Sequence, residues 1–240
     1  LVILACNPAT AVAARTLQRD WLPRSGWTNR NVLGIIAPTV EAATQTPWAV
    51  TTPQYPQKFN TDLVAVFATA RTVATEVYPE EILKRCPRVE VFQISCAGLA
   101  GAIEEGRSEA ELDTMVAAYV AEARRMLGGR EADRAILGCT HFPLVAHLFR
   151  SRLPARTRIV SQPELVADSL EYYLSRHPHF ASHQPGSEPP LAFKANVLCV
   201  TSGDPVAVES TLARFMPGRF GFVSMAEATA PLARPAAAAI

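Results

Sequence analysis

The sequence predicts an α/β protein with mainly parallel sheets and flanking helices. Short apolar runs alternate along the chain with amphipathic segments that have helical spacing. This alternation is typical of parallel sheets, because each parallel connection needs a long crossover that is usually a helix. In such sheets ligands bind at the carboxyl ends of the strands, so the residues that follow each strand are the first candidates for function.

The strands are predicted where apolar runs are short and bounded by turn residues. They are residues 1–5, 32–37, 63–69, 89–95, 135–138, 158–161 and 196–202.

Helices are predicted between these strands, and the longest has apolar residues at helical spacing and ends at two glycines. They are residues 9–22, 40–44, 73–85, 108–127, 144–152, 164–176 and 205–215. Residues 45–62 and 177–190, rich in proline and polar residues, are expected to be loops, and the tail 231–240 to be disordered.

Composition excludes several classes of protein. The 240 residues are 49% hydrophobic, which is enough for one large domain or two small ones. Lys and Arg number 23 against 22 for Asp and Glu, so the chain lacks the basic excess that nucleic-acid binding needs. Its apolar runs are too short to cross a membrane, and the opening LVILAC lacks the basic leader of a signal peptide.

Cysteine usage indicates a reduced, cytoplasmic protein. Five cysteines are scattered along the chain without a C-x-x-C pair, which argues against both a disulfide framework and a zinc site. Cys86, Cys96 and Cys199 lie in or beside apolar segments and are expected to be packing residues. His177, His179 and His183 are expected to lie in a solvated loop.

Two predicted strand ends resemble one another. Cys6 follows the first strand and Cys139 follows the run AILG, and a helix begins shortly after each cysteine. The N-terminus of a helix offers free backbone N–H groups and a positive dipole end, which favour a thiolate and a bound carboxylate.

Two such thiols suit inversion at a carbon acid. One group removes the Cα proton from one face, and the other returns a proton from the opposite face. A thiol has an ordinary pKa of about 8.5, so it can serve in either protonation state near neutral pH. Each cysteine taken alone also fits a small buried packing residue, and the residues by themselves leave both interpretations open.

Several segments resemble the glutamate racemase family, in the same order and over nearly the whole chain. LGCTHFPL is similar to the family signature L-G-C-T-H-Y-P-L, and ACNPAT is similar to A-C-N-T-A-S. The histidine after the second cysteine separates this motif from aspartate racemases, which have C-T-E there. Further resemblance lies in residues 34–43, 64–78, 95–106 and 200–205.

The resemblance implies two similar α/β domains with the active site in the cleft between them. The expected division is residues 1–45 plus 165–240 for the first domain and 46–164 for the second. It also implies a small-molecule substrate, glutamate, with neither pyridoxal phosphate nor a metal. The activity would supply D-glutamate for peptidoglycan, and the resemblance leaves a homodimer open.

The resemblance also assigns site residues. Cys6 and Cys139 match the paired acid and base catalysts, with His141 and Glu104 as the polar and acidic partners of Cys139. The expected substrate-binding residues are Asn7, Pro8, Thr72, Thr140 and His141.

The chain departs from the family pattern in three places. Pro8 replaces a threonine, which removes a hydroxyl and a backbone N–H, and Thr10 is expected to compensate in part. The loop 45–62 is longer than usual. The first strand of the family, with its Asp-Ser pair, and a later Tyr-Gly pair do not occur, so we expect an N-terminal segment to be missing before Leu1.

Two other functions remain open on these residues. One is a related racemase or decarboxylase that acts on aspartate or a hydantoin. The other is a degenerate, regulatory protein that binds a small acid or a partner without turnover.

Overall fold

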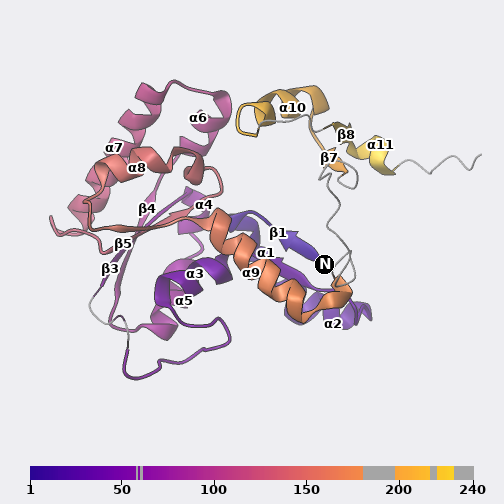
Figure 1. Cartoon of the computed structure of the whole chain (residues 1–240), viewed down its shortest axis with the longest axis horizontal. Helices are drawn as coiled ribbons and strands as arrows, with labels where there is room; N and C mark the ends of the chain where they lie inside the picture. Colours follow the sequence, from indigo (N-terminus) through magenta and orange to yellow (C-terminus); the bar gives the residue numbers. More distant parts are fainter. Residues whose placement is uncertain (58, 60–61, 181–197, 217–220, 230–240) are drawn as a thin grey trace, which may run out of the picture. The chain divides into compact units, whose positions relative to one another are not determined.

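The computed structural model describes residues 1–57, 59, 62–180, 198–216 and 221–229 of the chain (Figure 1). The chain forms two compact units, Leu1–Ser182 and His183–Ile240. The larger unit contains a four-stranded and a two-stranded sheet, and the smaller unit contains another two-stranded sheet.

The four-stranded sheet brings three strand ends together. Its strands are parallel and lie in the order β4-β3-β5-β6: β3 Leu63–Ala68, β4 Glu90–Ser95, β5 Arg134–Gly138 and β6 Arg158–Val160. Ala68 pairs with Ser95 on one side and with Gly138 on the other. The three strands therefore end at one edge, and the next residues there are Thr69, Cys96 and Cys139.

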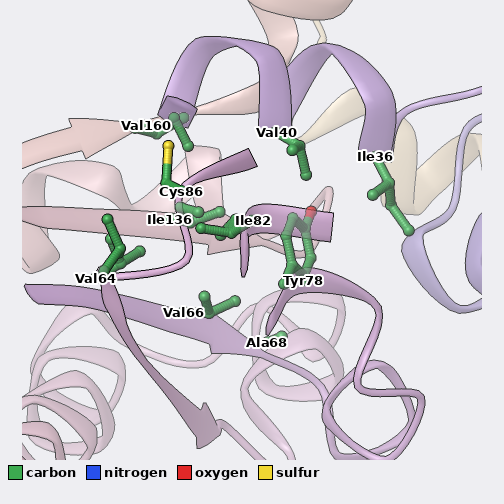
Figure 2. Close-up of a cluster of buried hydrophobic side chains, with 12 residues drawn as sticks. Ile36, Val40, Val64, Val66, Ala68, Tyr78, Ile82, Cys86, Ile136 and Val160 are labelled. Atoms are coloured by element: carbon green, nitrogen blue, oxygen red, sulfur yellow. The ribbon is translucent and has the colours of Figure 1, made fainter. Parts of the chain in front are cut away.

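Strand β3 is buried on both faces, which explains its continuous apolar sequence. Val64, Val66 and Ala68 face a cluster that includes Ile136 of β5 (Figure 2). Because side chains alternate along a strand, Phe67 points to the opposite face. There its ring packs edge-on against the ring of Phe149, with 5.1 Å between the ring centroids.

Helices cover both faces of this sheet (Figure 1). The helices α7 Glu109–Met126 and α8 Ala146–Arg152 lie on one face, and α3 Ile36–Thr44 and α5 Val77–Arg85 lie on the other. Helix α7 begins with a capping box, in which Ser108 and Glu111 satisfy each other's backbone N–H groups.

The two-stranded sheet of the larger unit pairs β1 Val2–Leu4 with β2 Val32–Gly34 in parallel. In the sequence, three helical segments connect these strands: α1 Asn7–Thr16, a π-helical turn Leu17–Trp21 and α2 Leu22–Ser25. Together they include the helix predicted over residues 9–22. The helix α9 Gln162–Arg176 contacts α3.

The smaller unit pairs β7 Cys199–Thr201 with β8 Phe222–Ser224 in parallel. Helix α10 Pro205–Ala213 and the short helix α11 Met225–Thr229 belong to the same unit. Strand β7 and helix α10 confirm the late strand and helix predicted from the sequence, whereas β8 and α11 were not predicted. Residues 196–197, the loop beyond residue 180 and the tail 231–240 lie outside the described part of the chain.

The structure corrects two further predictions. The strand predicted over residues 32–37 ends at Gly34, because Ile36 already begins helix α3. Ile35 and Ile36 are both buried, and a short apolar run does not distinguish a buried strand from the first turn of a buried helix. A helix also forms at α6 Leu99–Glu105, where none was predicted.

The remaining short elements are α4 Ala70–Val73 and the 3-10 turns Phe142–Val145 and Pro178–Phe180. The predicted class, parallel sheets with flanking helices, is confirmed. The predicted division into one domain of residues 1–45 plus 165–240 and a second domain of residues 46–164 stays a prediction. The cleft between these two domains also stays a prediction.

Candidate functional site

Cys6 lies between the end of strand β1 and the beginning of helix α1. It is the N-cap residue with an extended backbone, and its carbonyl accepts the first helical hydrogen bond from the N–H of Thr10 at 2.8 Å. Its thiol is exposed. Pro8 occupies the first turn of the helix, where a missing N–H does not disturb the helix ladder but removes one free donor near Cys6.

Asn7 is buried, and both ends of its amide are bonded within the protein. Its Nδ2 donates to Oε1 of Gln162 at 2.8 Å, and its Oδ1 accepts from the hydroxyl of Tyr78 at 2.7 Å. The Nε2 group of Gln162 also donates to Asn7 Oδ1 at 3.1 Å and to the hydroxyl of Thr39 at 2.9 Å. We call these four residues, Asn7, Thr39, Tyr78 and Gln162, the buried amide cluster.

Three members of this cluster were not predicted from the sequence. Thr39, Tyr78 and Gln162 belong to α3, α5 and α9, so only the tertiary structure brings them to Asn7. Gln162 is 155 residues away from Asn7 along the chain. A short motif carries no signal for a contact of that range.

Thr10 does not take the place of the hydroxyl lost at Pro8. Its hydroxyl donates to the carbonyl of Leu4 at 2.8 Å, and its methyl group lies against Gly34 of strand β2. Thr10 is 8% exposed, so it fastens α1 to the sheet rather than facing a ligand. The expectation that Thr10 compensates for Pro8 is therefore wrong.

Cys139 directly follows β5 and is 7% exposed. Burial raises the pKa of its thiol above the ordinary value, and a negative charge on Cys6 or Glu104 raises it further. The backbone N–H groups of His141 and Phe142 act in the opposite direction and lower the pKa of this thiol.

His141 connects Cys139 to an acidic side chain. Its Nε2 lies 2.7 Å from Oε1 of Glu104, and its Nδ1 lies 3.9 Å from the sulfur of Cys139. The His141 side chain is 31% exposed and the Glu104 side chain is 55% exposed, so this chain of three groups runs from a buried thiol to solvent. The sequence predicted this grouping, which needs the unpredicted helix α6 to carry Glu104.

The two threonines differ in their surroundings. Thr140 is exposed beside Cys139. Thr72 is fully buried in α4, and its hydroxyl lies 3.1 Å from that of Thr69, the N-cap of the same helix.

The remaining cysteines fit the packing role expected of them. Cys86 and Cys96 are buried and Cys199 is half-buried, and all five cysteines are free thiols. Burial strongly raises the pKa of Cys96, which keeps that thiol protonated.

Within residues 1–57, 59, 62–180, 198–216 and 221–229, no group of three or more His, Cys, Asp or Glu side chains is arranged to hold a metal ion. In the same described ranges, no helix is both long enough and apolar enough to span a membrane.

The chain is similar to curated relatives over most of its length. It is 43% identical to a glutamate racemase of Phenylobacterium zucineum over 226 residues, which cover 92% of this chain and 76% of the relative. It is 47% identical to a glutamate racemase of a Caulobacter species over 184 residues, which cover 74% of this chain and 64% of the relative. No protein-family model matches the chain.

Solved structures show the same fold. The chain aligns with a glutamate racemase of Francisella tularensis, solved with D-glutamate, at a TM-score of 0.67 and 18% identity, covering 92% of this chain and 70% of that one. A glutamate racemase isoform of Bacillus anthracis aligns at a TM-score of 0.65 and 21% identity, with coverage of 92% and 72%. The fold and the curated relatives together define an amino-acid racemase, an enzyme of the isomerase class. Within that class, the chain belongs to the glutamate racemase family.

Proposed function

We propose that this racemase interconverts L- and D-glutamate by proton transfer at Cα between two thiols, Cys6 and Cys139, without a cofactor. The observation that carries the proposal is that one buried side chain, Tyr78, contacts both cysteine turns: its hydroxyl donates to Asn7, next to Cys6, at 2.7 Å, and its ring lies against Gly138, next to Cys139. A pair of acid–base groups, one on each turn, is what inversion at a carbon acid needs.

In the proposed reaction, one cysteine begins as a thiolate and the other as a thiol. The thiolate takes the Cα proton, and the thiol gives its own proton to the opposite face of the planar carbanion. Each turnover therefore exchanges the protonation states of Cys6 and Cys139, and exchange with water restores them. The hydrogen at Cα of the product comes from solvent.

We assign His141 and Glu104 to the Cys139 side of this reaction. The carboxylate of Glu104 orients the imidazole through Nε2, and Nδ1 faces the sulfur. A polarised imidazole at this place favours proton movement to and from a thiol whose burial makes ionisation costly.

The substrate carboxylates are assigned to donors beside the two cysteines. Thr140 offers an exposed hydroxyl, and the first turn of α1 offers backbone N–H groups at residues that include Asn7. Because the side chain of Asn7 is held in the buried amide cluster, its contribution to binding falls mainly on its backbone. Pro8 shapes the same turn, and Thr72 contributes through the position of α4.

We place the enzyme in the cytoplasm as a supplier of D-glutamate for peptidoglycan, in keeping with its five free thiols. A homodimer stays a prediction that analytical ultracentrifugation can test. Rescue of bacterial growth in a strain that requires D-glutamate tests the metabolic role.

Incubation with glutamate in deuterium oxide tests the chemistry. We expect deuterium at Cα of the enantiomer that forms, and loss of this exchange by about 10²–10⁴-fold in both Cys6→Ala and Cys139→Ala. The matched control is Cys199→Ala, which removes a half-buried thiol of the smaller unit and should leave exchange unchanged. Normal turnover by either Cys6→Ala or Cys139→Ala would contradict the two-thiol proposal.

The choice of substrate needs its own test, because Pro8 departs from the family pattern. The same exchange assay with aspartate and with a hydantoin separates glutamate racemisation from the related reactions. Thermal stabilisation by glutamate without any exchange at Cα would favour the non-catalytic, acid-binding alternative.

A further inference from the structure

Tyr78 touches both of the turns that carry the two cysteines. Its hydroxyl donates to Oδ1 of Asn7, the residue after Cys6, at 2.7 Å. The edge of its ring lies against Gly138, the residue before Cys139: a Cβ atom at position 138 would meet Cε2 of Tyr78 at 3.1 Å. Tyr78 is fully buried, and Figure 2 shows its hydroxyl pointing from α5 towards α3.

We propose that Tyr78 is a positioning residue that holds the Cys6 turn and the Cys139 turn at a fixed separation. The inference rests on the proposed two-thiol function, since the separation of the turns sets how the thiols approach Cα. The contacts that carry this role are those of Tyr78 with Asn7 and Gly138, the residues next to the two cysteines.

The contact with Asn7 is rigid because it is buried and shared. Gln162 Nε2 donates to Asn7 Oδ1 and lies 3.3 Å from the hydroxyl of Tyr78, so the hydroxyl and the amide are held by a common third group. Buried hydrogen bonds of this kind are costly to leave unmade, and a shared network fixes one arrangement.

The contact with Gly138 depends on the absence of a side chain. Gly138 does not have a positive φ, so its backbone does not require glycine. A Cβ there would meet Cε2 of Tyr78 at 3.1 Å and the Cβ of Ala68 at 3.3 Å. We infer that residue 138 is glycine so that the Tyr78 ring can lie against the strand end from which Cys139 follows.

Proton transfer to and from carbon makes this separation important. Displacing a reacting group by about 1 Å can lower a rate roughly 10²-fold, because the reacting atoms must stay near 3–3.5 Å. A residue that contacts both turns therefore affects turnover without contacting the substrate.

The first experiment measures thiol chemistry and needs no turnover. The rate of Cys6 alkylation by iodoacetamide at one fixed pH is followed by mass spectrometry in Tyr78→Phe. We expect the Cys6 rate to differ from that of the unaltered chain. One variant, Tyr173→Phe, serves as the matched control and should leave the Cys6 rate unchanged.

The control separates positioning from general stability. Tyr173→Phe removes another tyrosine hydroxyl bonded to an asparagine amide, that of Asn31 at 2.6 Å. A Cys6 rate in Tyr78→Phe equal to that of the unaltered chain, or the same change in Tyr173→Phe, overturns the proposal.

The second experiment measures turnover. In Tyr78→Phe we expect kcat to fall about 10- to 100-fold with a smaller change in KM. The ratio of the primary isotope effects for Cα-deuterated L- and D-glutamate should differ from that of the unaltered chain, because the Cys6 turn is the one released. An unchanged kcat together with an unchanged ratio of isotope effects overturns the proposal. If the unaltered chain does not racemise glutamate, the proposed function fails while the alkylation result still decides the role of Tyr78.

A variant at the other contact guards against misfolding of Tyr78→Phe. Gly138→Ala places a methyl group against the Tyr78 ring. Its effect is measured as the alkylation rate of Cys6, which lies on the other turn. We expect a changed Cys6 alkylation rate, because the displacement passes through Tyr78 to Asn7. An unchanged rate at Cys6 in folded Gly138→Ala overturns the proposal.

Discussion

The Cys6 turn and the Cys139 turn share a local design and differ in what surrounds them. Each cysteine follows a parallel strand and comes shortly before a helical segment. Cys6 is exposed and follows a short strand of a two-stranded sheet, whereas Cys139 is buried and follows a strand inside a four-stranded sheet.

The groups beside each thiol differ from that thiol in their exposure to solvent. The exposed thiol of Cys6 stands beside Asn7, whose amide is fixed in a buried cluster. The buried thiol of Cys139 stands beside His141 and Glu104, which both reach solvent. In the proposed mechanism, Cys6 therefore depends on interactions that also stabilise the fold, while Cys139 depends on exposed groups that we expect to contribute to chemistry and little to stability.

The largest expected effect is on the Cys139 side. His141→Ala should lower kcat by roughly 10²–10⁴-fold, because it removes the imidazole that faces the buried thiol, and should change the free energy of unfolding by less than about 0.5 kcal/mol. Steady-state kinetics and urea denaturation measure the two quantities. The matched control is His147→Ala, which breaks the exposed pair of His147 with Glu109 and should leave kcat unchanged. A large loss of stability in His141→Ala would contradict the expectation that the groups beside Cys139 contribute little to the stability of the fold.

The next effect is on the Cys6 side and concerns stability. Asn7→Ala should lower the free energy of unfolding by about 3 kcal/mol, because the buried groups of Tyr78 and Gln162 lose their partner. Asn31→Ala is the control: it removes the amide that donates to Tyr173 in a part-buried place, and should cost less than about 1.5 kcal/mol. Urea denaturation measures both free energies of unfolding. Equal losses in the two variants would show that the buried amide cluster contributes no more stability than the part-buried bond of Asn31.

A smaller effect is expected at Glu104. Glu104→Gln keeps the shape of the side chain but removes the charge that orients His141, so we expect kcat to fall about ten-fold, close to 1.4 kcal/mol. The matched control is Glu105→Gln, which alters the neighbouring carboxylate paired with Arg107 and should leave kcat unchanged. An unaltered kcat in Glu104→Gln would remove the carboxylate from the mechanism.

The smallest effect is a dependence of stability on pH. Burial raises the pKa of the Cys139 thiol in the folded chain above its value in the unfolded chain. The contribution of the protonated thiol is therefore fully present below about pH 8.5, the ordinary pKa of a cysteine, and is lost as the pH rises through the folded pKa. Urea denaturation at several pH values should show a steeper alkaline decline for the unaltered chain than for Cys139→Ala. Parallel curves for the two proteins would contradict this account of burial.

Most of the fold followed from local pattern. The buried strand β3 was recognisable because both faces are apolar, and the long helix α7 because its apolar residues recur at helical spacing and glycines follow it. The end of β2 was misjudged because Ile35 and Ile36 are apolar whether the residues extend a strand or start a helix. Helix α6 was missed, although it carries Glu104 to His141.

Residues close together in the chain were enough to predict the class of fold, the two cysteine-bearing turns and the neighbourhood of Cys139 and His141. The surroundings of the two turns depend instead on tertiary packing. It buried Cys139 and left Cys6 exposed, and it joined Asn7 to Tyr78 and Gln162. Burial and long-range hydrogen bonds depend on which elements pack together, and no local pattern specifies that.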